Sequence, residues 1–155
     1  MATKNRASIL INGVRFSNGE MPEIRWFTEA NSQTFLAGDL VYISSGALTE
    51  CGADPATIAG IALAAGTNVT SGNASLPVLI LTRNVECAMN CYHASSASAT
   101  WSDDSGIGTA YEIVTNTAGV WEIDVAATSS TRVTVVEYMD AKSDIYMRAW
   151  VRFLS

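Results

Sequence analysis

Three cysteines and a single histidine are the residues of this chain whose types could bind a metal or act as nucleophile and base. Cys87, Cys91 and His93 are separated by even numbers of residues, so a strand would point all three side chains toward one face. With Cys51 they would supply the ligand types of a zinc site. On a strand, however, Cys87 and Cys91 would lie about 13 Å apart, which is too far to share one ion. We therefore expect no metal site.

Cys91 and His93 could instead form a nucleophile–base pair, as in cysteine hydrolases. On a strand their Cβ atoms would lie about 6–7 Å apart. The sequence offers no evident third residue that could orient the histidine. A histidine at the start of a loop is the simpler interpretation, and we expect no catalytic role for either residue.

The acidic and glycine-containing turns also lack an active-site pattern. Asp103 with Asp104, and Asp140 with Asp144, do not follow the ligand spacing of an EF-hand loop. The Gly-Ile-Gly turn at 106–108 lacks the third glycine and the following helix of a dinucleotide-binding fingerprint. The sequence therefore predicts no catalytic residues, no cofactor and no enzymatic activity.

The C-terminal segment 146–154 alternates clearly and predicts a strand with one buried face. The predicted core face carries Met147, Ala149, Val151 and Phe153. The opposite face carries Tyr146, Arg148, Trp150 and Arg152. Aromatic and arginine side chains are enriched at protein interfaces, so we expect a partner interface formed by Trp26, Arg148, Trp150 and Arg152. The alternative is that the arginine stems cover Trp150 on an ordinary solvated face.

Tryptophan provides a second possible binding chemistry. Trp26, Trp101, Trp121 and Trp150 could line a platform for sugar rings, although aromatic residues in strands more often fill the core. A carbohydrate-binding site therefore remains an alternative.

Composition limits the possible partners. The chain has 155 residues, 48% of them hydrophobic and only 15% charged, against about 25% charged in ordinary soluble domains. Such a surface is consistent with coverage by a protein partner. The net charge of −6 argues against nucleic acid and against anionic membranes. We expect neither a signal peptide nor a membrane helix, and we expect the odd number of cysteines to be free thiols.

The strands that must position these residues are short. Apolar, β-favouring runs lie at 40–43, 58–63, 76–82, 84–92, 110–115, 120–124, 132–138 and 146–154. Turn signals separate them every 8–12 residues, and no segment predicts a convincing helix. We therefore predict an all-β fold, a compact barrel or sandwich of about ten short strands. Residues 1–34 are expected to form an extended N-terminal arm or short strands, and residues 35–155 the β-barrel domain.

Several of these segments, in their order along the chain, resemble the head decoration, or cement, proteins of tailed bacteriophages. The resembling segments are AGDLVY at 37–42, ADP at 53–55, IAGIA at 58–62, LPVLI at 76–80, ECAMNCY at 86–92, GVWEID at 119–124, TRVTVVE at 131–137 and VRFL at 151–154. Together they extend over residues 36–155, whereas residues 1–35 match less well.

The resemblance implies a compact β-barrel on the outer surface of the virion, assembled in the host cytoplasm. Its expected partner is the major capsid protein, whose neighbouring subunits a homotrimer would bridge at threefold points. Nothing catalytic carries over from this family. The alternatives are a head-fibre base or a carbohydrate-binding β-module on the virion.

Overall fold

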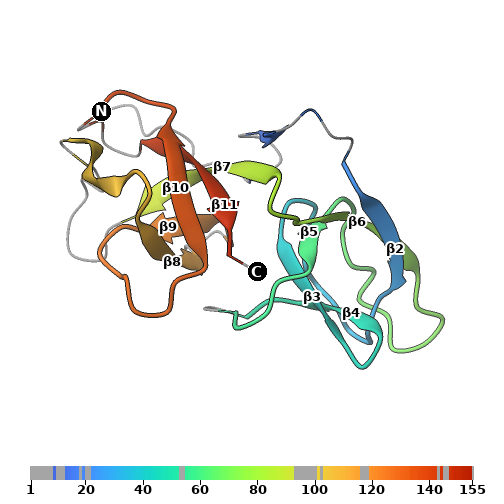
Figure 1. Cartoon of the computed structure of the whole chain (residues 1–155). Coiled ribbons are helices and arrows are strands. Elements are labelled where there is room, and N and C mark those ends of the chain that lie inside the picture. The colour runs from blue at the N-terminus through green and yellow to red at the C-terminus, as the bar shows by residue number, and fades with distance from the viewer. Residues whose placement is uncertain are drawn as a thin grey trace.

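The computed structural model describes residues 9, 13–17, 19, 22–52, 55–92, 101, 103–115, 119–142, 144 and 147–154. This part of the chain forms eleven strands and one short 3-10 helix, η1 (Asp104–Gly106). The predicted all-β fold is confirmed. The strands form two lobes, each built around one sheet (Figure 1). Among the described residues, no helix is long and apolar enough to cross a membrane.

The first lobe contains a closed five-stranded barrel. Its strands are β7 (Val85–Tyr92), β8 (Ala110–Thr115), β9 (Trp121–Asp124), β10 (Val133–Tyr138) and β11 (Arg148–Phe153). Antiparallel pairs follow the order β7-β11-β10-β8-β9, and parallel pairing of 90–92 in β7 with 122–124 in β9 closes the ring. β1 (Val14–Phe16) pairs with residues 85–87 at the start of β7. β9 pairs with the same edge of β7 at residues 90–92.

The second lobe is a five-stranded antiparallel sheet. Its strands are β2 (Ile24–Thr28), β3 (Leu40–Ser44), β4 (Ala47–Glu50), β5 (Gly60–Ala62) and β6 (Ser75–Ile80). They follow the order β2-β6-β5-β3-β4. A single bridge between Glu29 and Leu48 joins the end of β2 to β4, so the sheet curls toward closure.

Two glycines explain local features of the second sheet. Ser45 and Gly46 form the two-residue loop between β3 and β4, with φ of 49° and 83°, as a primed hairpin turn requires. Serine and glycine at 44–46 are residue types that favour such a turn. In β5, a Cβ atom on Gly60 would lie 2.2 Å from the carbonyl oxygen of Leu79. Only glycine allows β5 and β6 to approach this closely.

The middle strands of the second sheet are buried on both faces. One face packs within its own lobe; this cluster consists of Phe35, Val41, Leu48, Ala62, Leu76 and Val78. On the other face, Leu40, Ile61 and Leu79 belong to the same apolar cluster as the barrel interior. The apolar run at 58–63 thus contains a strand that is buried on both faces. A continuous apolar core connects the lobes.

The last strand shows the predicted alternation. Met147, Ala149 and Val151 are fully buried, and Phe153 is 7% exposed. The facing strand β10 has a bulge at Val136, because Val135 pairs with Val151 whereas Glu137 pairs with Trp150. The bulge places Glu137 on the outer surface beside Trp150.

Parts of the predicted N-terminal arm form short strands. β1 pairs with β7 of the barrel, and β2 pairs with β6 of the second sheet. Residues 1–8 lie outside the described part of the chain. The division into an arm (1–34) and a barrel domain (35–155) stays a prediction.

Candidate functional site

The outer face of β11 presents the three predicted interface residues of the barrel lobe. Arg148 binds the carboxylate of Asp140 through Nε (3.0 Å) and through its terminal nitrogen Nη2 (2.9 Å). Arg152 binds Glu86 on the neighbouring strand β7 at 2.6 Å. Between these arginines lies Trp150, which is half-buried. Both arginines therefore hold partners within the chain, yet their side chains remain 38% and 41% exposed.

A fourth residue, Arg15 of β1, covers Trp150. Its guanidinium carbon lies 4.3 Å from the centre of the indole ring, which is a cation–π distance. Arg15 also binds Glu86 and Glu137, each at 2.7 Å. The sequence analysis missed Arg15, because pairing between β1 and β7 is a long-range contact that alternation within one strand does not reveal. The alternative interpretation named the arginine stems of the C-terminal strand, whereas the guanidinium that lies over Trp150 belongs to Arg15.

Glu86 is the centre of this network. It is 3% exposed and accepts hydrogen bonds from Arg15 and Arg152, which approach from opposite neighbouring strands. Burial, the largest single influence, would raise the pKa of this carboxyl. The hydrogen bonds and charges of the two arginines outweigh it and hold the pKa below its ordinary value. Glu86 is therefore a charged residue that ties β1, β7 and β11 together.

Trp26, the fourth predicted interface residue, lies in the other lobe. Its strand, β2, is part of the second lobe (Figure 1). Trp26 is 65% exposed, and Ile24 on the same face of β2 is 48% exposed. The structure therefore does not bring the four predicted residues into one patch. Of the four tryptophans, only Trp26 is exposed. Trp101 and Trp121 are buried, and Trp150 lies under Arg15.

Among the described strands, β2 is an edge strand that pairs only with β6, apart from the bridge between Glu29 and Leu48 at its end. Ile80 N–H donates to the carbonyl of Glu23, which therefore faces β6. In an antiparallel pair every second residue directs its backbone groups toward the partner strand, so Arg25 and Phe27 face β6 as well. The N–H and C=O groups of Ile24 and Trp26 face away from β6. Exposed apolar side chains on an open strand edge form a surface suited to protein contact.

The three cysteines are buried free thiols. Cys87 and Cys91 point into the barrel with no exposed surface, and Cys51 is 5% exposed. Burial raises the thiol pKa of Cys51 and of Cys87 to about 12, and it raises that of Cys91 as well. His93 lies outside the described residues. Among the residues that the structure describes, no group of three or more His, Cys, Asp or Glu side chains could hold a metal.

The acidic turn residues have structural partners. Asp103 accepts a hydrogen bond from Ser105 N–H at 3.0 Å and caps η1. Asp104 forms an ion pair with Lys142 at 2.7 Å, and Asp140 binds Arg148. These contacts stabilise turns around the barrel.

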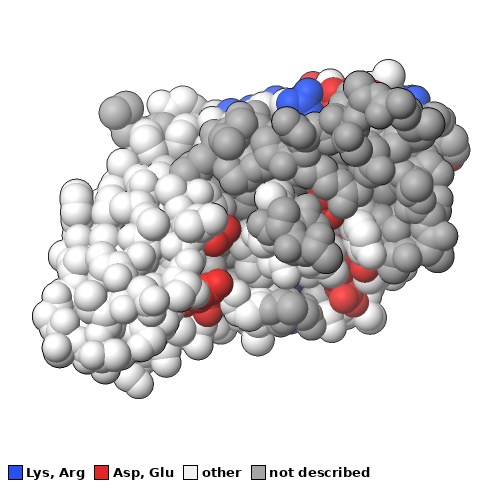
Figure 2. Space-filling view, turned by 180° about the vertical axis from the view of Figure 1, so that it is seen from behind, with Lys and Arg blue, Asp and Glu red and all other residues white. Residues whose placement is uncertain are grey.

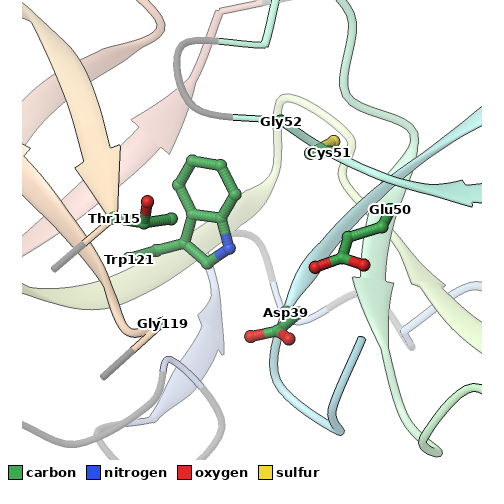
Figure 3. Close-up of a pocket in the computed structure, with 7 residues that line it drawn as sticks. All are labelled: Asp39, Glu50, Cys51, Gly52, Thr115, Gly119 and Trp121. Atoms are coloured by element: carbon green, nitrogen blue, oxygen red, sulfur yellow. The ribbon is translucent and has the colours of Figure 1, made fainter. Parts of the chain in front are cut away.

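A pocket lies where the two lobes meet, and the sequence analysis did not anticipate it. It has a volume of about 250 Å³. Its lining residues are Asp39, Glu50, Cys51, Gly52, Thr115, Gly119 and Trp121 (Figure 3). Asp39 and Glu50 belong to the second lobe, and Trp121 belongs to the barrel. Seen from behind, Asp and Glu atoms gather where the lobes meet (Figure 2).

The chain matches no model of a known protein family, and a search among curated proteins found no significant match.

Proposed function

We propose that this protein is a structural virion protein, a decoration or cement protein that binds the outer surface of a tailed-phage head. It would stabilise contacts between major capsid subunits and would perform no catalysis. The observation that carries the proposal is the exposed apolar edge of β2, formed by Ile24 and Trp26. Exposed apolar patches on soluble proteins are typical of interaction sites.

Three other properties support this proposal. Only 15% of the residues are charged, which suits a protein whose surface is partly covered in its working state. The fold is a compact all-β structure, as the resembling decoration proteins imply. The segments that carry that resemblance include β3, β5, β6, β7 and β11, the strands that build and connect both lobes. Many weak contacts, repeated over a capsid lattice, would give tight binding through avidity.

We further propose that the working form is a homotrimer at threefold positions of the head. Native mass spectrometry at neutral pH tests the oligomeric state of the purified chain. A metal-free mass near three times 16.5 kDa supports the trimer. A monomer that stays monomeric on assembled heads contradicts it.

Heat-induced release of DNA from heads tests the cement role. Binding to the assembled state stabilises that state by mass action, so decorated heads should release DNA at a higher temperature than bare heads. Ile24→Ser combined with Trp26→Ser should abolish this shift. Ile107→Ser is the matched control, because Ile107 is an exposed apolar residue (43%) of the other lobe. Equal release temperatures for bare and decorated heads would refute the cement role.

The exposed indole of Trp26 also favours one alternative, a carbohydrate-binding module or head-fibre base on the virion. Glycan-array binding that disappears in Trp26→Ala, without any binding to heads, would establish this alternative in place of the cement role.

A further inference from the structure

The pocket between the lobes combines negative charge with an aromatic wall. Asp39 and Glu50 project into it from one lobe, and the indole of Trp121 faces them from the other (Figure 3). None of the described lining residues is Lys, Arg or His. The described lining of the pocket therefore carries two carboxylates and no cationic side chain.

The free hydrogen-bonding atoms of the pocket define its complement. Asp39 uses Oδ2 to accept from Leu36 N–H at 2.7 Å, and Glu50 uses Oε2 to accept from the Thr34 hydroxyl at 3.2 Å. Within the described part of the chain, the second oxygen of each carboxylate has no hydrogen-bond donor. Two acceptors thus remain for a ligand.

Trp121 adds an independent observation. Its side chain is 3% exposed, and its indole nitrogen points across the pocket toward the two carboxylates (Figure 3). No described residue accepts a hydrogen bond from this N–H group. Because this N–H group faces the open pocket and not the closed core, it can donate a hydrogen bond to a molecule that enters the pocket.

The two carboxylates of the pocket repel each other. Burial raises the pKa of the Asp39 carboxyl, the backbone bond from Leu36 opposes this, and the negative charge of Glu50 raises it further. A bound cation would remove the repulsion between the two carboxylates.

We propose that this pocket binds an organic cation, the side chain of an arginine or lysine on a partner polypeptide. A guanidinium carries enough donors to bind both free carboxylate oxygens. A peptide carbonyl close to that side chain can accept from Trp121, which a simple polyamine cannot do. The volume of about 250 Å³ is below the range for drug-sized ligands and suits one side chain. This inference does not depend on the proposed capsid role.

Titration of the full chain with N-acetyl-arginine amide tests the proposal. The indole N–H resonances in NMR spectra monitor the binding. The Trp121 resonance, assigned with Trp121→Phe, should shift and saturate. N-acetyl-citrulline amide has nearly the same shape without the charge and should leave this resonance unchanged. Because that comparison uses the unaltered protein, it does not depend on the folding of any variant.

Variants then locate the site. Asp39→Asn and Glu50→Gln should each weaken binding of N-acetyl-arginine amide by about tenfold or more, as expected for loss of a charged hydrogen-bond partner. Glu23→Gln, which removes an exposed carboxylate elsewhere, is the matched control and should bind as the wild type does.

Four results would overturn the proposal. They are absence of saturable binding, equal binding of the citrulline compound, affinities unaffected by both pocket variants, and tighter binding of spermidine than of N-acetyl-arginine amide. The last result would assign the pocket to free polyamines. If only pocket binding fails while head binding persists, the cement role stands and the cation inference falls.

Discussion

Replacing Glu86 by glutamine tests the charge network that joins β1, β7 and β11. The substitution keeps the shape of the side chain and one acceptor oxygen but removes the negative charge. Arg15 and Arg152 would then lose their common ionic partner, which is 3% exposed in the folded protein.

The expected loss of stability is moderate. A hydrogen bond to a charged group contributes about 1.5–3 kcal/mol when it is shielded from solvent. Here the two arginine side chains are 37% and 41% exposed, so solvent screening reduces each contribution. The amide of glutamine also retains part of the hydrogen bonding. We therefore expect Glu86→Gln to lower the free energy of unfolding by about 1–2 kcal/mol at pH 7.

The loss should depend on pH in a defined direction. The folded pKa of Glu86 lies below its ordinary value, so its ionised form stabilises the protein above the unfolded pKa, about 4.3. This contribution disappears as the pH falls through the folded pKa. The wild type then loses the stabilisation by the ionised carboxylate, which the variant lacks at every pH. The unfolding free energies of the two proteins should therefore converge toward pH 3.

Urea unfolding at pH 7 and pH 3, followed by circular dichroism, measures both differences. Glu23→Gln is the matched control, because Glu23 also pairs with an arginine but its side chain is 43% exposed. We expect this control to change the stability by no more than about 0.5 kcal/mol. The reasoning would be refuted if Glu86→Gln had the same free energy of unfolding as the wild type at pH 7. It would also be refuted if the difference between the two proteins were as large at pH 3 as at pH 7.

Three further predictions concern the core and the turns. Gly60→Ala should lower the free energy of unfolding in urea by about 2 kcal/mol or more, because the added Cβ would lie 2.2 Å from the Leu79 carbonyl oxygen. Gly52→Ala, where the added Cβ would meet open space, should change little. Equal effects of the two substitutions would contradict this packing. Tyr138→Phe should cost about 1–3 kcal/mol and speed hydrogen exchange at Gly106, whose N–H donates to the Tyr138 hydroxyl at 3.0 Å; unchanged exchange would argue against that bond. At pH 8 the three buried thiols should react slowly with a thiol reagent in the native protein and fully in urea; a fast native reaction would contradict their raised pKa values.

The sequence predicted local structure well where a single strand contains its own signal. Alternation in 147–153 identified the buried face of β11, because side chains on a strand alternate regardless of its partners. The turn at 44–46 was recognisable from its glycine. The all-β class followed from the density of short apolar segments and turn residues.

Contacts between distant segments were not predictable in this way. The parallel pairing of β7 with β9 closes the barrel, yet no local pattern in either strand specifies it. Glu29 stands in a polar stretch of the sequence, yet it is 1% exposed and accepts hydrogen bonds from Thr67 and Ala74 across the second lobe. A buried carboxylate of this kind depends on donors about forty residues away.

The same limit applied to the candidate sites. Trp26 is exposed, and its role as a contact residue stays a prediction. Its separation from β11 became visible only in the folded chain. The pocket needs Asp39 and Glu50 from one lobe and Trp121 from the other. Residues this far apart in sequence give no spacing signal.

Cosedimentation of the purified protein with assembled heads tests the central proposal most directly. The heads should be formed by the major capsid protein that is encoded with this chain and should lack bound decoration protein. We predict saturable binding at a fixed number of copies per head, lost when both Ile24 and Trp26 are replaced by serine. Absence of binding at micromolar concentrations of the folded wild-type protein would contradict the proposed function.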